Sequence, residues 1–125
     1  MGFRNKDLIT LEKEFKEVSD ELIITTDDGS YGISGFAINE LKKDCQQETP
    51  DKIFACGPLP MLKAVQAFAK EHNIPCEISL EQKTACGLGA CLGCAVKTAK
   101  SPNDAPEYWH VCKAGPVFNA TDVEI

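Results

Sequence analysis

A stretch near the start of the chain has hydrophobic residues three or four positions apart, the spacing of a helix that buries one face. The first predicted helix begins near Asn5 or Asp7, either of which can cap it. Its hydrophobic face is formed by Leu8, Leu11, Phe15 and Val18. The second predicted helix runs from Phe36 to Asp44, with Ser34 as its expected cap.

A third helix is expected after the turn that begins at Gly57. Pro60 suits its first turn, because the missing N–H of proline costs nothing there. Asn73 and Pro75 are typical of the end of a helix. Its hydrophobic face contains Met61, Leu62, Val65, Phe68 and Ala69.

Short runs with β-forming residues precede and follow these helices, at 21–25, 51–56 and 76–80. Ile53, Phe54 and Ala55 are consecutive, which predicts a strand buried on both faces, as in parallel sheets. The alternation of helices and strands predicts a parallel α/β sheet.

The pattern changes after Leu80, where two further strands are expected at 95–98 and 108–112 with an exposed turn at 100–107 between them. The predicted fold class is therefore α/β, with a partial parallel-sheet lobe at 1–80 and a small domain with a β-hairpin at 81–125.

A glycine-rich loop at 84–94 contains three cysteines in a C-x4-C-x2-C pattern: Cys86, Cys91 and Cys94. A fourth, Cys112, follows on a later segment. This is the plant-type spacing for a 2Fe–2S cluster. Glycines give such a loop the conformational freedom to turn its sulfurs inward, and small residues let backbone N–H groups approach the sulfurs.

Other interpretations of the cysteines are open but weaker. Structural zinc sites usually combine two short C-x2-4-C pairs, whereas this chain has a tight trio and a distant fourth. A disulfide framework conflicts with seven cysteines and the absence of a secretory signal. A Rieske centre needs two histidine ligands, and neither His72 nor His110 lies in the loop. If 108–112 is a strand, His110 and Cys112 share a face, and His110 is then interpreted as a residue at the solvent edge or beside the cluster ligands.

Composition limits the function further. The 125 residues have 43% hydrophobic content, enough for a core, and no run approaches the length of a membrane span. The formal charge of −6, which a cluster would make more negative, disfavours nucleic acid as a partner. Free or metal-binding cysteines favour the reducing cytoplasm.

Two turns have both a structural and a functional interpretation. Asp27, Asp28 and Gly29 predict a turn, because aspartates bond their own backbone and glycine takes positive φ, and they are also candidate nucleotide contacts. Cys56, Gly57 and Pro58 join a predicted strand to a helix, the place where ligands bind in open α/β sheets.

These motifs together resemble the electron-transfer subunit of NAD-linked dihydroorotate dehydrogenase, in the ferredoxin reductase superfamily. The resemblance is carried by the segments 25–32, 55–58, 85–94 and 111–118. It implies that Cys86, Cys91, Cys94 and Cys112 are the metal ligands and that Cys56–Pro58 lies near the nicotinamide. It also implies FAD and NAD as cofactors of the full-length family, in addition to the cluster.

On this resemblance, the chain corresponds to the C-terminal half of the family, without the flavin-binding barrel and the first strand of the nucleotide-binding lobe. Loss of a central strand leads us to expect self-association or strand exchange. The expected partner is the FMN-containing catalytic subunit.

The expected function is one-electron transfer between flavins in the NAD-linked oxidation of dihydroorotate to orotate, a step of pyrimidine biosynthesis. No residue is assigned a catalytic role, and the chain is not expected to catalyse the reaction alone. The alternatives are a zinc-stapled interaction module and a generic ferredoxin-like carrier.

Overall fold

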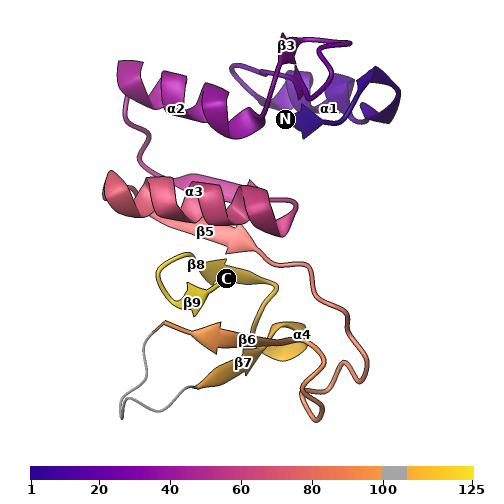
Figure 1. Cartoon of the computed structure of the whole chain (residues 1–125), viewed down its shortest axis with the longest axis vertical. Coiled ribbons are helices and arrows are strands. Elements are labelled where there is room, and N and C mark those ends of the chain that lie inside the picture. Colours follow the sequence, from indigo (N-terminus) through magenta and orange to yellow (C-terminus); the bar gives the residue numbers. More distant parts are fainter. Residues whose placement is uncertain (100–106) are drawn as a thin grey trace. The chain divides into compact units, whose positions relative to one another are not determined.

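Parallel and antiparallel strands both occur in the part of the chain that the computed structural model describes, residues 1–99 and 107–125 (Figure 1). The described strands form three sheets, in the orders β1-β2-β3, β4-β5-β8 and β7-β6-β9. The chain divides into two compact units, 1–48 and 49–125. The predicted α/β class is thus confirmed in its broad form, as a mixed rather than purely parallel arrangement.

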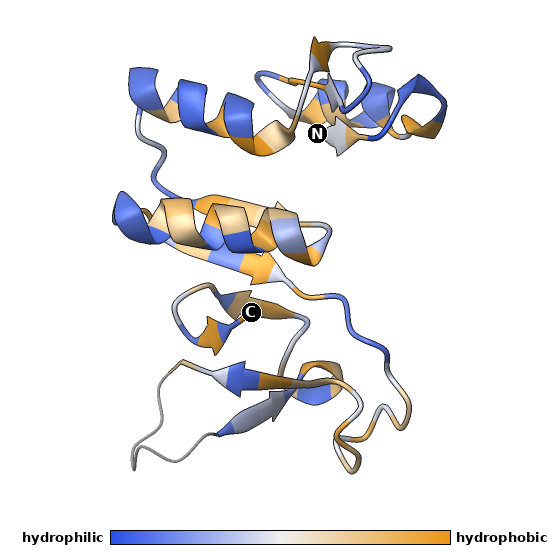
Figure 2. Cartoon of the chain, in the orientation of Figure 1, coloured by the Kyte–Doolittle hydropathy of each residue, from blue (hydrophilic) through white to orange (hydrophobic). Residues whose placement is uncertain are grey.

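The first unit is built on short parallel strands: β1 (Gly2–Phe3), β2 (Thr25–Thr26) and β3 (Ile33–Ser34). Its helical elements are a 3-10 turn at Lys6–Leu8, then α1 (Glu12–Val18) and α2 (Ala37–Gln47). The last turns of α2 are strongly hydrophilic (Figure 2), and no residue of this helix is buried.

The first predicted helix is wrong in its extent. The Asn5 side chain accepts a hydrogen bond from the Asp7 N–H at 3.1 Å, but this cap serves only the 3-10 turn. Leu11 has a left-handed backbone, with φ of 58°, so the helical path is interrupted before α1 begins. The hydrophobic face is consequently broken, and Val18 is 82% exposed.

Two neighbouring predictions also need correction. The strand expected at 21–25 is confined to Thr25 and Thr26. Ser34 lies in β3 and does not cap α2; Phe36 occupies the cap position, without a side-chain hydrogen bond to the helix. The hydroxyl of Ser34 is therefore not the signal that starts this helix.

In the second unit, β4 (Ile53–Cys56) lies parallel to β5 (Cys76–Ser79), and α3 (Leu59–Glu71) connects them. The hydrophobic face of α3 is buried as predicted, through Leu62, Val65, Phe68 and Ala69. Helix α3 begins next to Pro60 and ends before Asn73, whose φ of 54° breaks the helical path. Both end signals are confirmed.

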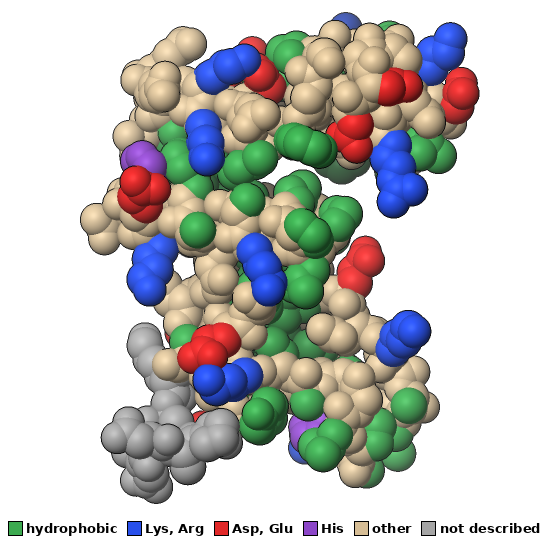
Figure 3. Space-filling view, viewed as in Figure 1, with side chains coloured by type: hydrophobic (Ala, Val, Ile, Leu, Met, Phe, Trp, Pro, Cys, Tyr) green, Lys and Arg blue, Asp and Glu red, His purple; other side chains and the backbone are tan. Residues whose placement is uncertain are grey.

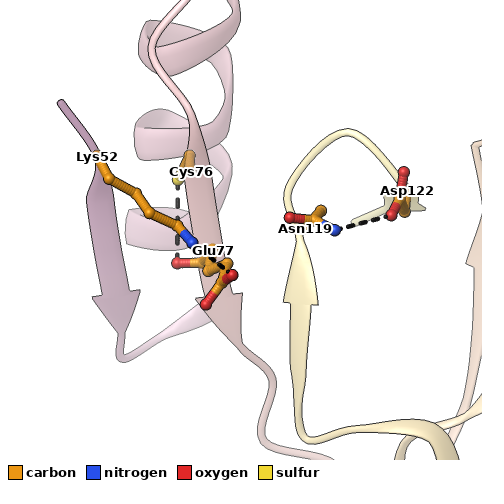
Figure 4. A network of polar contacts seen from close by, with 5 residues as sticks. All are labelled: Lys52, Cys76, Glu77, Asn119 and Asp122. Atoms are coloured by element: carbon orange, nitrogen blue, oxygen red, sulfur yellow. Dashed lines mark hydrogen bonds and ion pairs between the residues drawn. The ribbon is translucent and has the colours of Figure 1, made fainter.

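Burial of β4 on both faces is not observed. Ile53 is buried, but Phe54 is 70% exposed, because successive side chains of a strand point to opposite faces. The Lys52 ammonium lies 2.6 Å from a Glu77 carboxylate oxygen (Figure 4). It also lies 4.9 Å from the centre of the Phe54 ring. This face of β4 and β5 thus carries charged and aromatic side chains rather than core residues.

The C-terminal strands connect two sheets of the second unit. β8 (Val117–Asn119) pairs antiparallel with β5, while β6 (Ala95–Thr98) pairs with β7 (Tyr108–His110) and β9 (Val123–Glu124). The Gln66 amide of α3 donates to the carbonyls of Ala120 and Val123, which ties the helix to the turn between β8 and β9. That turn is also closed by a hydrogen bond of 3.2 Å from Asn119 to Asp122 (Figure 4).

The paired strands expected at 95–98 and 108–112 are present in part. β6 matches the prediction, but the second strand ends at His110 and is followed by the short helix α4 (Val111–Ala114). Most of the turn predicted at 100–107 lies outside the described residues. A separate domain at 81–125 stays a prediction.

None of the helices in the two described ranges has the length and apolar content that crossing a bilayer requires.

Candidate metal centre

The loop at 84–94 turns backbone N–H groups toward the sulfur of Cys86. The Leu88 N–H donates to this sulfur at 3.4 Å, and the N–H groups of Ala90 and Cys91 also point to it. Gly87 and Gly89 have φ of 68° and 77°, values that other residues rarely adopt. The glycines therefore give the loop the curvature that folds it back over its own first cysteine, as the sequence indicated.

The hairpin of β6 and β7 brings the distant fourth cysteine to this loop. Ala95 pairs with His110, so Cys94, immediately before β6, lies opposite Val111. The Val111 N–H donates to the Cys94 carbonyl at 3.0 Å. Cys112 is the next residue along the chain, and the register of two antiparallel strands thereby places it beside Cys94.

The four thiols meet as two pairs. The Cys91 thiol donates a hydrogen bond to the Cys86 sulfur, and the Cys112 thiol donates to the Cys94 sulfur. The Gly89 N–H also donates to Cys112, and the Cys86 sulfur lies within electrostatic range of Cys112. The loop and α4 thus contribute to one cluster of sulfurs, which we call the cysteine quartet: Cys86, Cys91, Cys94 and Cys112.

The pairing of the quartet can be compared with the needs of different metals. Over residues 1–99 and 107–125, no group of three or more His, Cys, Asp or Glu side chains is placed so that it could hold a metal ion. The thiols lie instead in two hydrogen-bonded pairs, Cys86 with Cys91 and Cys94 with Cys112. A 2Fe–2S core takes two ligands at each of two irons, and a tetrahedral zinc ion takes four.

Hydrogen bonds also set the charge of the first cysteine. The backbone N–H of Leu88, those of Cys91 and Ala90, and the Cys91 thiol together lower the pKa of Cys86 to about 6. The thiolate is the form of cysteine that binds metals. The pKa of Cys112 is raised, first by its hydrogen bond to Cys94 and then by burial. The hydrogen bonds of the loop therefore favour the thiolate form of Cys86.

The quartet lies between the protein core on one side and exposed side chains of the loop on the other. Cys94 is 1% exposed and belongs to the core, whereas Leu88 and Leu92 are 79% and 78% exposed. Hydrophobic side chains gather on the visible surface over the loop and α4 (Figure 3). On the inner side, the Trp109 and Phe118 rings stack with their centres 6.0 Å apart, which supports the end of the hairpin.

The predicted strand face shared by His110 and Cys112 is wrong. His110 ends β7, and Cys112 lies in the first turn of α4. Two residues apart on a helix do not face each other, whereas two residues apart on a strand do. The alternation argument for His110 beside the cluster therefore fails.

The two candidate nucleotide-binding turns lie in different units and are described separately. The Asp28 carboxylate accepts hydrogen bonds from the Ser30 N–H at 2.9 Å and the Ser30 hydroxyl at 2.6 Å, which lower its pKa. Gly29 has φ of 71°, as the predicted turn requires, and Asp27 is exposed. The turn is confirmed, and its role as a nucleotide contact stays a prediction.

Cys56, Gly57 and Pro58 connect β4 to α3 as predicted. Cys56 is exposed at the carboxyl end of the strand. A Cβ at Gly57 would lie only 2.7 Å from the terminal carbon of Met61, so a side chain there would displace Met61. The segment is thus a strand-to-helix turn with an exposed thiol, that of Cys56.

Sequence reasoning did not assign the link between Gly89 and Cys112. It expected N–H groups near sulfurs in general, without saying which donor served which cysteine. Gly89, which lies between the ligands Cys86 and Cys91, was the available signal for an N–H donor in the loop. Which sulfur accepts its hydrogen bond depends on where α4 lies.

An α/β unit that presents four paired thiols on a glycine-rich loop and an adjoining helix has the donor set typical of iron–sulfur proteins. Comparison with known proteins supports this class. Residues 81–124 match the family model described as the iron–sulfur cluster binding domain of dihydroorotate dehydrogenase B.

The chain is similar over its whole length to electron-transfer subunits of dihydroorotate dehydrogenase B (NAD(+)). The protein of this name from Fusobacterium nucleatum subsp. nucleatum is 43% identical, over 100% of this chain and 46% of its own length. That from Caldanaerobacter subterraneus subsp. tengcongensis is 39% identical, over 98% and 47%. The resemblance inferred from the motifs is thus confirmed, and the chain spans about half the length of these relatives.

A solved structure is also similar. It is a chain reported in a study of flavin-based electron bifurcation by the NADH-dependent reduced ferredoxin-NADP oxidoreductase. The TM-score is 0.77 at 31% identity, over 98% of this chain and 42% of that one. Two independent comparisons, by sequence and by structure, therefore lead to iron–sulfur and flavin-linked electron-transfer proteins.

Proposed function

We propose that this chain carries a 2Fe–2S cluster and relays single electrons between flavins in the NAD-linked oxidation of dihydroorotate to orotate. The observation that carries the proposal is the cysteine quartet, formed within the segment that matches the iron–sulfur family model. Its partner would be the FMN-containing catalytic subunit, with FAD and NAD bound by the complete electron-transfer subunit.

In this proposal the two pairs of thiols hold the two irons. Cys86 and Cys91 would bind one, and Cys94 and Cys112 the other. When bound, the cluster supplies a one-electron carrier. The protein's own contributions are the N–H groups of Leu88 and Gly89, which donate to ligand sulfurs, and the burial of Cys94. Hydrogen bonds to sulfur and exposure to solvent are known determinants of the potential of such clusters.

The test is reconstitution of the purified 125-residue chain with iron and sulfide under anaerobic conditions. We expect two irons and two sulfides per chain and a rhombic EPR signal after reduction with dithionite. Cys94→Ser should lose most of the iron and the signal, because it removes a buried ligand. Cys45→Ser is the matched control, since Cys45 is a free thiol of α2 outside the quartet, and should retain both.

A colourless chain with one tightly bound zinc would contradict the relay and support the zinc-stapled module instead. Retention of the full signal in Cys94→Ser would show that the quartet is not the ligand set.

We further propose, for each unit by itself, that Asp27, Asp28 and Gly29 are nucleotide contacts and that Cys56, Gly57 and Pro58 lie near a nicotinamide. The support is their position directly after β2 and β4, because ligands of open α/β sheets bind at the carboxyl ends of strands. NADH should slow alkylation of the exposed Cys56 relative to Cys45 in the same sample. If NADH slows the alkylation of both cysteines equally, or slows neither, the result argues against a nicotinamide site at Cys56.

A further inference from the structure

The side chain of Lys113 lies against the cluster loop. A Cβ placed on Gly89 would stand 3.1 Å from Cδ of Lys113, 3.6 Å from its Cβ and 3.9 Å from its Cγ. Three carbons of the lysine stem therefore cover the open face of this glycine. Gly89 is also the residue whose N–H donates to the Cys112 sulfur, and Cys112 directly precedes Lys113 in α4.

This contact keeps the stem of Lys113 beside the loop. The ammonium of Lys113 is only two bonds beyond Cδ, so it cannot move far from the loop while the stem rests on Gly89. The loop itself, residues 84–94, contains no Asp, Glu, Lys or Arg. The formal charge of the whole chain is −6, and four thiolate ligands would add negative charge at the quartet.

We propose that Lys113 is a tuning residue for the cluster, which favours the reduced form because its cation is anchored against Gly89 beside the quartet. Reduction adds one electron, and hence one negative charge, without breaking a bond. A fixed cation nearby stabilises the more negative form by Coulomb attraction, and salt weakens this attraction at an exposed site. The inference rests on the proposed 2Fe–2S function.

The experiment is an EPR-monitored redox titration of the reconstituted 125-residue chain at low and high ionic strength. Lys113→Met removes the charge and keeps an unbranched stem on Gly89, and Lys113→Gln is a second neutral variant. Lys113→Arg keeps the charge. Lys63→Met is the matched control, because it changes the net charge equally from an exposed position on α3.

We expect both neutral variants to lower the midpoint potential. The equilibrium constant for one-electron reduction should fall about three- to tenfold at low ionic strength. Lys113→Arg should restore the wild-type potential, Lys63→Met should change it much less, and high salt should diminish the shift. Iron content measured beside each titration shows that the variants retain the cluster.

Equal potentials for Lys113→Met and Lys63→Met would overturn the inference. A shift that salt does not diminish and arginine does not rescue would also overturn it, since packing and not charge would then be the cause. A wild-type chain that binds no cluster overturns the proposed function as well. A wild-type cluster whose potential is insensitive to residue 113 overturns only the role of Lys113.

Discussion

Residues 1–48 and 49–125 contain the same kinds of elements but differ in their interiors. In the first unit, which is described throughout, the buried residues are Ile24, Thr25 and Thr26. The second buries large side chains almost completely, with Leu62 at 1% and Ile78 at 0% exposure. Helix and strand patterns alone therefore do not indicate where a core forms.

The difference bears on function because the quartet belongs to the well-packed unit. Cys94 is itself a core residue, and Val111, its backbone partner in the hairpin, is 5% exposed. A metal centre needs ligands held in a narrow geometry, which packed neighbours provide. The candidate turn at Asp27–Gly29 lies in the loosely packed unit, where its position depends on local hydrogen bonds such as those from Ser30 to Asp28.

The largest expected effect contrasts a fully buried site of the second unit with an exposed site of the first. Ile78→Ala should lower the free energy of unfolding by about 3 kcal/mol, because it leaves a cavity at a fully buried site. Val18→Ala, at an 82% exposed site of the first unit, should change it by less than about 0.5 kcal/mol. Urea denaturation followed by circular dichroism measures both. Similar losses would mean that burial of the truncated side chain does not set the cost of the substitution.

A smaller effect is expected within the cluster loop, where two glycines form a matched pair. Both Gly87 and Gly89 have positive φ, so alanine should cost each about 1 kcal/mol. A Cβ at Gly87 meets no atom within 4 Å, but at Gly89 it meets the Lys113 stem at 3.1 Å. We expect Gly89→Ala to lose iron to a chelator faster than Gly87→Ala. Equal rates would show that contact with α4 does not hold the loop.

The smallest effect concerns the surface of the second unit. Lys97 and Glu124 form an ion pair of 2.6 Å between β6 and β9, and both side chains are about half exposed. Such pairs contribute little, so Lys97→Met should barely change the urea midpoint at neutral pH. A large loss there would mean that surface charge, and not burial, stabilises this unit.

The same pair has a defined pH dependence. The hydrogen bond from Lys97 to Glu124 raises the pKa of the lysine. Its contribution is therefore fully present below the unfolded pKa of about 10.4 and is lost as pH rises through the higher folded value. The small difference between wild type and Lys97→Met should vanish in strongly alkaline solution, as measured by urea midpoints across that range.

Local signals predicted much of the second unit correctly. Pro60 and Asn73 marked the ends of α3, and its hydrophobic face was buried as the spacing indicated. The C-x4-C-x2-C spacing and its glycines identified the loop. These succeeded because caps, breakers and loop curvature are decided by residues close together in the chain.

Predictions failed where a distant neighbour decides the outcome. Phe54 is exposed because burial of a strand face depends on what covers it, and Leu11 interrupts a helix whose hydrophobic residues had regular spacing. Cys112 lies on a helix and not a strand, since β7 ends where its pairing with β6 ends at His110.

By itself, the amino-acid sequence determined the kind of chemistry, because the identity and spacing of four cysteines restrict the metals that they can bind. The tertiary structure decided which sulfurs are paired, which N–H serves each one, and that Lys113 lies on Gly89. Those features depend on the register of β6 and β7 and on where α4 packs, and pairing between segments far apart in the chain cannot be deduced from local sequence.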